Sequence, residues 1–212
     1  SDVFRHANVS LLEKLFPNLT SRHGIPFWPN LDRPWSVFDD TEKDNLISQI
    51  IKISGDDRVF IHPSAKIGDF VSIEGPSYIG KNVEVRNSAF IRKGTWLCEG
   101  SLVGHSSEIK NSILLPGAKA PHFNYVGDSI MGHEVNLGAG TKLSNVRNDR
   151  RVVLVTIDDG TRLDTGLRKL GAIIGDCSQL GCNVVTNPGS ILMPDSMIKP
   201  NVTISGWNET RS

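Results

Sequence analysis

The stretch that decides the fold is residues 61–109, which read in sixes as IHPSAK IGDFVS IEGPSY IGKNVE VRNSAF IRKGTW LCEGSL VGHSSE I. Each group begins with isoleucine, leucine or valine, and its fifth residue is small or β-branched. Six is neither the period of an α-helix nor the alternation of a two-sided strand. It is typical of a hexapeptide β-helix, in which three short strands close a triangular coil of about 18 residues. A β-sandwich is the alternative, and such even spacing disfavours it.

The six-residue pattern returns near the C-terminus, from Ile174 to Ile204. Between the two runs the register holds if two groups are shortened to five residues, one on each side of the segment 119–125. A repeat that breaks its own rule usually does so for a site. Glycine follows the inward aliphatic residue at Gly68, Gly80 and Gly104, and we predict that these glycines suit the corners of the coils. The fold class is therefore mainly β, a parallel β-helix with a site near residues 119–125.

Two other regions lack the period. Residues 1–56 are predicted to form an arm, with a capping box at Ser10–Glu13 before a short helix ending at Pro17, a loop rich in Pro and Trp, and a helix over 41–53. We expect this arm to cap the open first coil. The β-helix is predicted over 57–206 with a hairpin inserted at 146–170, and 207–212 form a tail.

Composition excludes several classes of function. Lys plus Arg and Asp plus Glu both number 23, so no electrostatic argument favours nucleic acid as a partner. The sequence contains neither a long apolar run nor a signal peptide. This predicts a cytoplasmic protein that does not bind or cross a membrane. The three cysteines show no zinc spacing, so we expect no metal site.

Stacking turns sequence distance into contact. Glu74, Arg92 and Lys110 are each 18 residues apart and predict a column, in which Gly127 is the next member after one short group. Two stacked cations repel unless something compensates them. Either Glu74 pairs with Arg92, or a phosphate binds in the space that Gly127 leaves above Lys110.

His122 lies in the register-break segment, with Asp128 just beyond it. A structural role is the alternative, but an imidazole can take a proton from an amine near neutral pH. The sequence has no nucleophile elbow and no phosphate loop, so direct attack with a general base is the simplest chemistry.

Four stretches resemble the acetyltransferase domain of the bifunctional GlmU family: AFIRKG at 89–94, VGHSSEIK at 103–110, KAPHFNYVGD at 119–128 and NLGAGT at 136–141. The resemblance implies a left-handed β-helix, acetyl-CoA as co-substrate and a homotrimer with its sites between subunits. Unlike that family, this sequence is expected to lack a nucleotidyltransferase domain, because no Gly-rich nucleotide loop precedes the β-helix. The sequence departs from the family at Pro121, where Gly is usual, and in the four residues after Asn145.

Carried over to this sequence, the family pattern makes His122 the general base. Arg92, Lys110 and Tyr125 would hold the sugar phosphate beside the imidazole, and Asn136 and Asn145 would contact the sugar. Lys169 would come from a neighbouring subunit. The amide of Ala139 would meet the acetyl carbonyl, and the coils around Cys182 and Pro200 would line the CoA arm.

The resemblance predicts an N-acetyltransferase that acts on an amino-sugar phosphate such as glucosamine 1-phosphate, in nucleotide-sugar biosynthesis of the UDP-N-acetylglucosamine type. The alternative is a non-catalytic module for trimerisation, or for binding sugar phosphate or nucleotide sugar, in a protein like UDP-N-acetylglucosamine pyrophosphorylase. A third hypothesis keeps the same mechanism, but the acyl acceptor is a hydroxyl group or another amino sugar.

Overall fold

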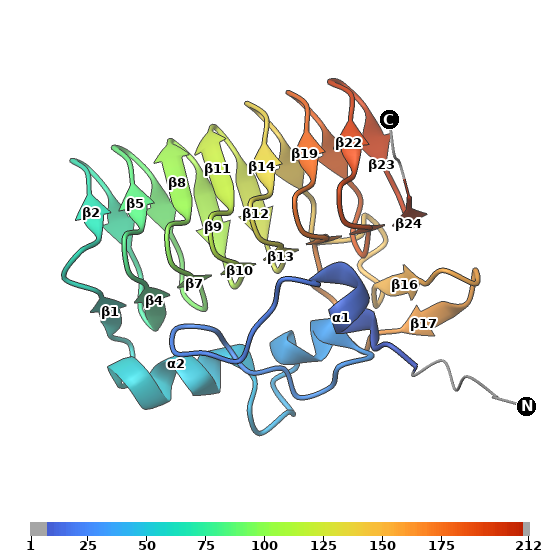
Figure 1. The fold of residues 1–212 in the computed structure, drawn as a ribbon, viewed down its shortest axis with the longest axis horizontal. Coiled ribbons are helices and arrows are strands. Elements are labelled where there is room, and N and C mark those ends of the chain that lie inside the picture. Colours follow the sequence, from blue (N-terminus) through green and yellow to red (C-terminus); the bar gives the residue numbers. More distant parts are fainter. Residues whose placement is uncertain (1–7, 210–212) are drawn as a thin grey trace, which may run out of the picture.

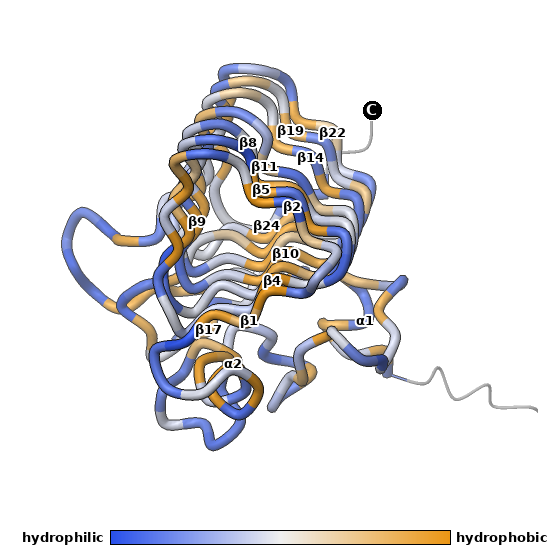
Figure 2. Tube along the Cα trace, turned by 90° about the vertical axis from the view of Figure 1, so that its left-hand side faces the viewer, coloured by the Kyte–Doolittle hydropathy of each residue, from blue (hydrophilic) through white to orange (hydrophobic). Residues whose placement is uncertain are grey.

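A computed structural model describes residues 8–209 and confirms the β-helix. Three sheets of eight, seven and seven parallel strands form the sides of a left-handed triangular prism. Figure 1 shows the coils stacked along the long axis, and Figure 2 shows the triangular section. Successive strands of the chain fall on successive sides, so each sheet takes every third strand.

The strands are short, as the six-residue period requires. Sheet 1 contains β1 (Val59–Ile61), β4 (Ser77–Ile79), β7 (Trp96–Leu97), β10 (Ile113–Leu114), β13 (Ile130–Met131), β18 (Ile173–Ile174), β21 (Ile191–Leu192) and β24 (Trp207–Asn208). Sheet 2 contains β2 (Lys66–Ile67), β5 (Glu84–Val85), β8 (Leu102–His105), β11 (Lys119–His122), β14 (Asn136–Leu137), β19 (Gln179–Leu180) and β22 (Met197–Ile198). Sheet 3 contains β3 (Ser72–Ile73), β6 (Phe90–Ile91), β9 (Glu108–Lys110), β12 (Tyr125–Gly127), β15 (Lys142–Leu143), β20 (Val185–Thr186) and β23 (Thr203–Ile204).

The pairing register confirms the two shortened groups. Ile73 pairs with Ile91, 18 residues on, whereas Leu97, Leu114 and Met131 pair at intervals of 17. From Ile73 onward, the aliphatic residues that begin each group of six form or pack against one interior cluster. Because an inward side chain in each strand fixes the register, every outward residue has a defined height on its side of the prism.

The glycines that follow inward residues serve a different purpose from the one predicted. Gly68, Gly80 and Gly104 do not have positive φ; left-handed corner positions are occupied by residues such as Asn82 and Gly100. A Cβ on Gly80 would lie 2.7 Å from the carbonyl oxygen of Leu97 on the next coil. These positions require glycine because neighbouring coils approach closely.

Gly104 gives the sharpest test of this close approach. A Cβ there would collide with the carbonyl of Pro121, so Gly104→Ala is expected to lower the free energy of unfolding by about 3 kcal/mol. Gly100 is the matched control: its φ is +69° and a Cβ would meet nothing within 4 Å. Gly100→Ala should lower the free energy of unfolding by only about 1 kcal/mol, the strain of an alanine with left-handed φ. If urea denaturation shows the same loss of unfolding free energy in both variants, the close-approach explanation is contradicted.

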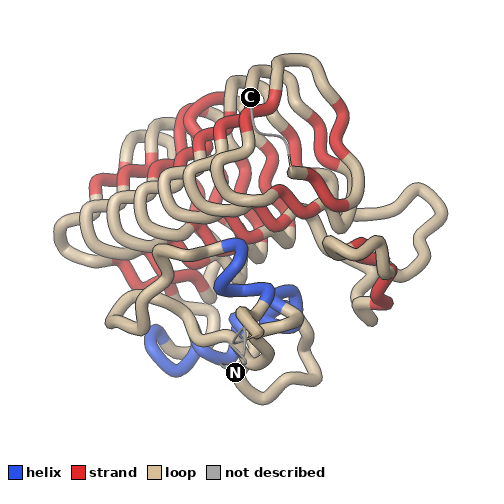
Figure 3. The backbone as a smooth tube through the Cα atoms, turned by 45° about the vertical axis from the view of Figure 1, so that its right-hand side comes forward, coloured by secondary structure: helices blue, strands red, loops and turns tan. Residues whose placement is uncertain are grey.

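An antiparallel hairpin interrupts the β-helix between β15 and β18. It consists of β16 (Leu154–Thr156) and β17 (Arg162–Asp164) and projects from one side of the prism (Figures 1 and 3). The β-helix also extends beyond its predicted end, because β24 pairs with β21. The prediction of a tail from residue 207 was therefore wrong for residues 207 and 208, and residues 210–212 lie outside the described part of the chain.

The arm contains α1 (Leu11–Leu15), the 3₁₀ helix η1 (Pro34–Phe38) and α2 (Leu46–Ser54). The capping box at Ser10 and Glu13 is confirmed. The second helix begins at Leu46 rather than Thr41, because the Asn45 side chain accepts a hydrogen bond from the N–H of Ser48 and ends the preceding turn. None of the helices within residues 8–209 is both long enough and apolar enough to span a membrane.

The arm does not cap the first coil, which corrects the prediction. It lies along the outer side of sheet 1 (Figures 1 and 2), and Ile61 and Ile67 of the first coil stay 43% and 39% exposed. The reason is the outward residue of each sheet 1 strand, which is aromatic or aliphatic: Phe60, Tyr78, Trp96, Ile113, Ile130, Ile173, Ile191 and Trp207. This apolar side needs a cover, and the arm provides it.

Candidate active site

His122 ends β11 at the corner between sheets 2 and 3, where its side chain is exposed. The corner is held from inside by Asn124, which is 3% exposed. Its Oδ1 accepts the backbone N–H of His122 at 3.0 Å, and its Nδ2 donates to the carbonyl of Gly138 at 2.9 Å. The imidazole itself forms no hydrogen bond within residues 8–209, so both ring nitrogens remain available.

The predicted CoA-contacting residues lie at the same corner, one coil after another. The carbonyl of His122 accepts from Gly140, that of Ala139 from Asn183 and that of Cys182 from Asn201. These links stack His122, Ala139, Cys182 and Pro200 in one column. The N–H of Ala139 donates to no acceptor in the described part of the chain, and it is therefore free to meet a ligand oxygen.

The cation column forms on sheet 3 as predicted, but it is compensated differently. Arg92 pairs with Glu108 at 3.3 Å, and Lys110 pairs with Asp128 at 3.0 Å. Glu74 does not pair with Arg92; its Oε2 accepts the backbone N–H of Lys93 at 3.4 Å. Each cation thus has its own carboxylate on the same side of the prism.

Asp128 is the centre of this polar network and is only 2% exposed. Its carboxylate accepts hydrogen bonds from Lys110 Nζ, from Asn111 Nδ2 at 2.8 Å and from Asn145 Nδ2 at 2.6 Å. Asn145 Nδ2 also donates to Tyr125 Oη at 3.2 Å. Burial raises the pKa of Tyr125, which keeps its hydroxyl protonated and free to donate.

The space expected above Lys110 is occupied. Gly127 pairs with Lys110, but a Cβ on Gly127 would lie 2.6 Å from Asn145 Nδ2 and 2.7 Å from Tyr125 Oη. Glycine here makes room for these two side chains rather than for a phosphate. An anion must approach the cations from outside sheet 3.

Comparison with known proteins identifies the family. No family model matches the chain. A bifunctional sugar-1-phosphate nucleotidylyltransferase/acetyltransferase of Sulfurisphaera tokodaii is 36% identical over 84% of this chain and 46% of its own length. The bifunctional protein GlmU of Methanococcus maripaludis is 37% identical over 91% and 49%. YaiX of Escherichia coli, an uncharacterized acetyltransferase, is 34% identical over 75% and 69%.

The chain belongs to the GlmU-like hexapeptide-repeat acetyltransferases. It spans about half the length of the two bifunctional relatives. The resemblance that the four sequence stretches indicated is thereby confirmed.

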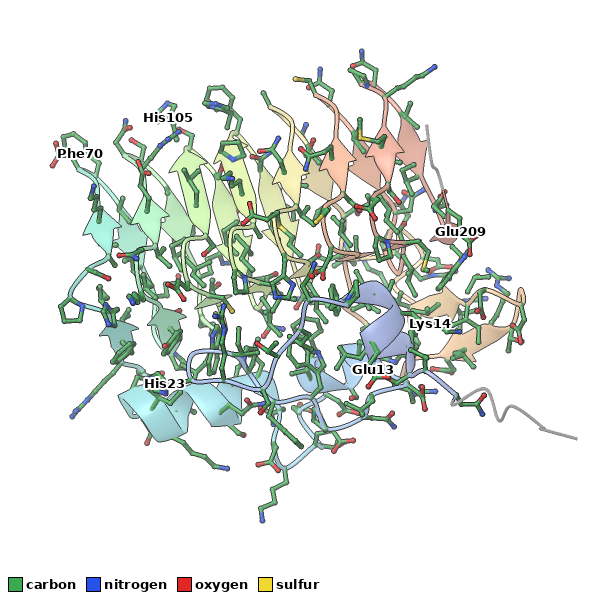
Figure 4. The ribbon with its side chains drawn as sticks, viewed as in Figure 1. Glu13, Lys14, His23, Phe70, His105 and Glu209 are labelled. Carbon is green, nitrogen blue, oxygen red and sulfur yellow. The ribbon has the colours of Figure 1, made fainter. Side chains whose placement is uncertain are left out.

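The GlmU-like residue set divides between two sides of the prism. Lys110 and Tyr125 lie in sheet 3, and Arg92 and Asn145 lie just after its strands β6 and β15. Asn136 instead lies on the outer side of sheet 2. No hydrogen bond or ion pair joins His122 to Arg92 or Lys110 within residues 8–209, since Lys110 is level with Gly127 at the far end of β12. Figure 4 shows this corner at the top of the view, where His105 marks the coil before His122.

Lys169 lies apart from the His122 corner. It is exposed, just after the hairpin, and the N–H of its neighbour Leu170 donates to the carbonyl of Asn145 at 3.0 Å. Within one chain it therefore lies beyond Asn145, at the corner between sheets 3 and 1.

Three polar residues that lie beside the candidate site residues were not predicted from the sequence. Glu108 pairs in register with Tyr125, so the 17-residue spacing could have located it. Lys142 is the next residue in that column, and its Nζ donates to the carbonyl of Gly140 at 2.7 Å. The role of Asn124 had no sequence signal beyond its place two residues after His122.

The Asp128 network yields a stability prediction. Asp128→Asn leaves the part-buried Lys110 ammonium without a carboxylate, and we expect the free energy of unfolding to fall by about 3 kcal/mol. The control is Glu84→Gln, which breaks an exposed pair with Arg86 and should change it by less than about 1 kcal/mol. If both variants unfold at the same urea concentration, Asp128 is not the anchor of the network.

Proposed function

We propose that this chain is an acetyl-CoA-dependent N-acetyltransferase for an amino-sugar 1-phosphate, with glucosamine 1-phosphate as the first acceptor to test. One observation carries the proposal. The corner column of His122 and the free Ala139 amide borders a sheet whose outer side holds Arg92 and Lys110. A base, an oxyanion donor and a pair of phosphate-binding cations are the groups that this transfer needs.

In the proposed reaction the acceptor lies along β12, with its phosphate toward Arg92 and Lys110 and its amine toward His122. The amine attacks the thioester carbonyl, and a C–N bond forms as the C–S bond breaks. His122 takes the proton that the amine loses, and the Ala139 N–H donates to the oxygen that gains negative charge. The CoA thiolate leaves, and the proton on His122 can neutralise it.

The coils after His122 offer a surface for the CoA arm. A cavity of about 390 Å³ lies on sheet 2 beside the Cys182–Pro200 column, lined by Gln179, Leu180, Gly181, Met197, Ile198 and Lys199. Its walls are largely apolar, which suits a pantetheine chain, and Lys199 offers a charge for a phosphate. This fit supports acetyl-CoA as the co-substrate.

His122→Ala tests the base. We expect kcat for CoA thiol release with glucosamine 1-phosphate to fall about 10²- to 10⁴-fold, since a positioned base contributes that much. The matched control is His105→Ala, which removes an imidazole from the same corner one coil earlier and should leave kcat close to that of the unchanged chain.

A panel of amino-sugar phosphates, nucleotide amino sugars and hydroxyl acceptors then identifies the acceptor. Equal rates for His122→Ala and His105→Ala would overturn the mechanism. Calorimetric binding of a sugar phosphate or nucleotide sugar without any thiol release would instead identify the chain as a binding module.

We also propose that each site forms between two subunits of a homotrimer, because one chain places its site residues on two diverging sides. Mixed trimers of His122→Ala and Lys169→Ala chains test this. If each site takes His122 from one chain and Lys169 from the next, random equal mixing regenerates about a quarter of the sites. Trimers of either variant alone should stay inactive. No recovery after mixing, or a monomer in sedimentation, would contradict the shared site.

A further inference from the structure

A second candidate site lies away from the His122 corner, between the arm and the β-helix. A cavity of about 120 Å³ opens where the arm loop 22–25 crosses the corner between sheets 1 and 2. Its polar lining comes from Arg22, His23, His62, Tyr78, Lys81 and Glu99. Figure 4 labels His23 on the arm, next to the first coils. Neither the GlmU-like residue set nor the proposed reaction uses these residues.

The Tyr78 hydroxyl points to a ligand. Tyr78 is 4% exposed, and its ring is stacked between Phe60 at 4.9 Å and Trp96 at 4.4 Å. Its Oη has no hydrogen-bond partner within residues 8–209, and it lies beside Gly24, where a Cβ would be 3.4 Å away. Tyr78 lines the cavity, so its hydroxyl can donate to a molecule bound there. Burial raises the pKa of Tyr78, and the hydroxyl remains a donor.

His62 adds a second donor of fixed direction. Its Nδ1 accepts the backbone N–H of Ser64 at 3.1 Å and lies 2.8 Å from Ser64 Oγ. The proton of the neutral imidazole therefore sits on Nε2. The ring can donate from that atom without first becoming charged.

The charges of the lining favour an anion. Arg22 and Lys81 contribute two cations against the single carboxylate of Glu99, whose contact with Arg22 is loose at 4.0 Å. Hydrogen-bond donors around an excess of positive charge are the chemistry that recognises phosphate oxygens. Since a water molecule occupies about 30 Å³ of liquid, a cavity of 120 Å³ suits a tetrahedral anion rather than a whole nucleotide.

We propose that this cavity binds a phosphate group, either as inorganic phosphate or as the phosphate of a small monoester. Arg22 belongs to the arm, whereas His62, Tyr78 and Lys81 belong to the β-helix. A bound phosphate therefore joins the arm to the β-helix.

The test measures binding of inorganic phosphate by calorimetry. The chain carries Arg92→Gln, so that the sheet 3 cations contribute less to the measured phosphate binding. Tyr78→Phe removes the hydroxyl and keeps the ring stack, and Arg22→Gln removes an exposed cation that the core does not need. Each should weaken binding at least about tenfold, because each removes a hydrogen bond to a charged group. The matched control is Lys66→Gln, which changes an exposed lysine of β2. It should bind phosphate as tightly as the parent, which is the chain with Arg92→Gln alone.

A parent that binds no phosphate at millimolar concentration would overturn the proposal, as would unchanged affinity in Arg22→Gln, which is not expected to disturb folding. A competition arm with glycerol 3-phosphate distinguishes the sources. Displacement at equal or lower concentration assigns a monoester, and failure to displace assigns the free ion. Hydrogen exchange gives an independent readout: phosphate should slow exchange of the 22–25 amides in the parent and not in Tyr78→Phe.

Discussion

The structure depends on the parallel hydrogen bonding between successive coils. Each strand has only two to four residues, so almost no stability resides within a strand, and the ladder between coils holds the chain. The ladder tolerates coils of 17 or 18 residues, provided that one aliphatic side chain per side points inward. Once those inward residues are placed, the height of every outward residue follows, whether it is polar or apolar.

This constraint explains how the candidate site is built. Sheet 3 places Arg92 and Lys110 on adjacent coils, where bare cations would repel each other. The same ladder places Glu108 and Asp128 within reach, and each cation gains a carboxylate. The two pairs differ, because Asp128 is buried and Glu108 is part-exposed. In the proposed acceptor complex, the phosphate would therefore replace the carboxylate partner of Arg92 more easily than that of Lys110, which Asp128 holds in place.

Sequence reasoning predicted the coil register, both shortened groups and the membership of the cation column, since all of these follow from inward aliphatic residues. It did not predict which carboxylate would form an ion pair with Arg92. The position of a residue in a column fixes its height along the prism, but not the direction in which a long side chain points. The place of the arm was predictable in principle. The residues before the inward aliphatics of sheet 1, such as Tyr78 and Trp96, form an apolar column, and only a covered side can carry one.

The geometry of the corner at His122 supports the proposal that a second chain completes the site. Sheets 2 and 3 diverge from this corner, so Asn136 and Tyr125 lie on different sides of a convex edge (Figure 2). A convex edge cannot exclude water from a reacting amine, and electrostatic stabilisation of an oxyanion is strongest where water is excluded. A neighbouring subunit laid against the edge would turn it into the wall of a cleft. Phe123, 57% exposed beside His122, is an apolar side chain that such a neighbour would cover.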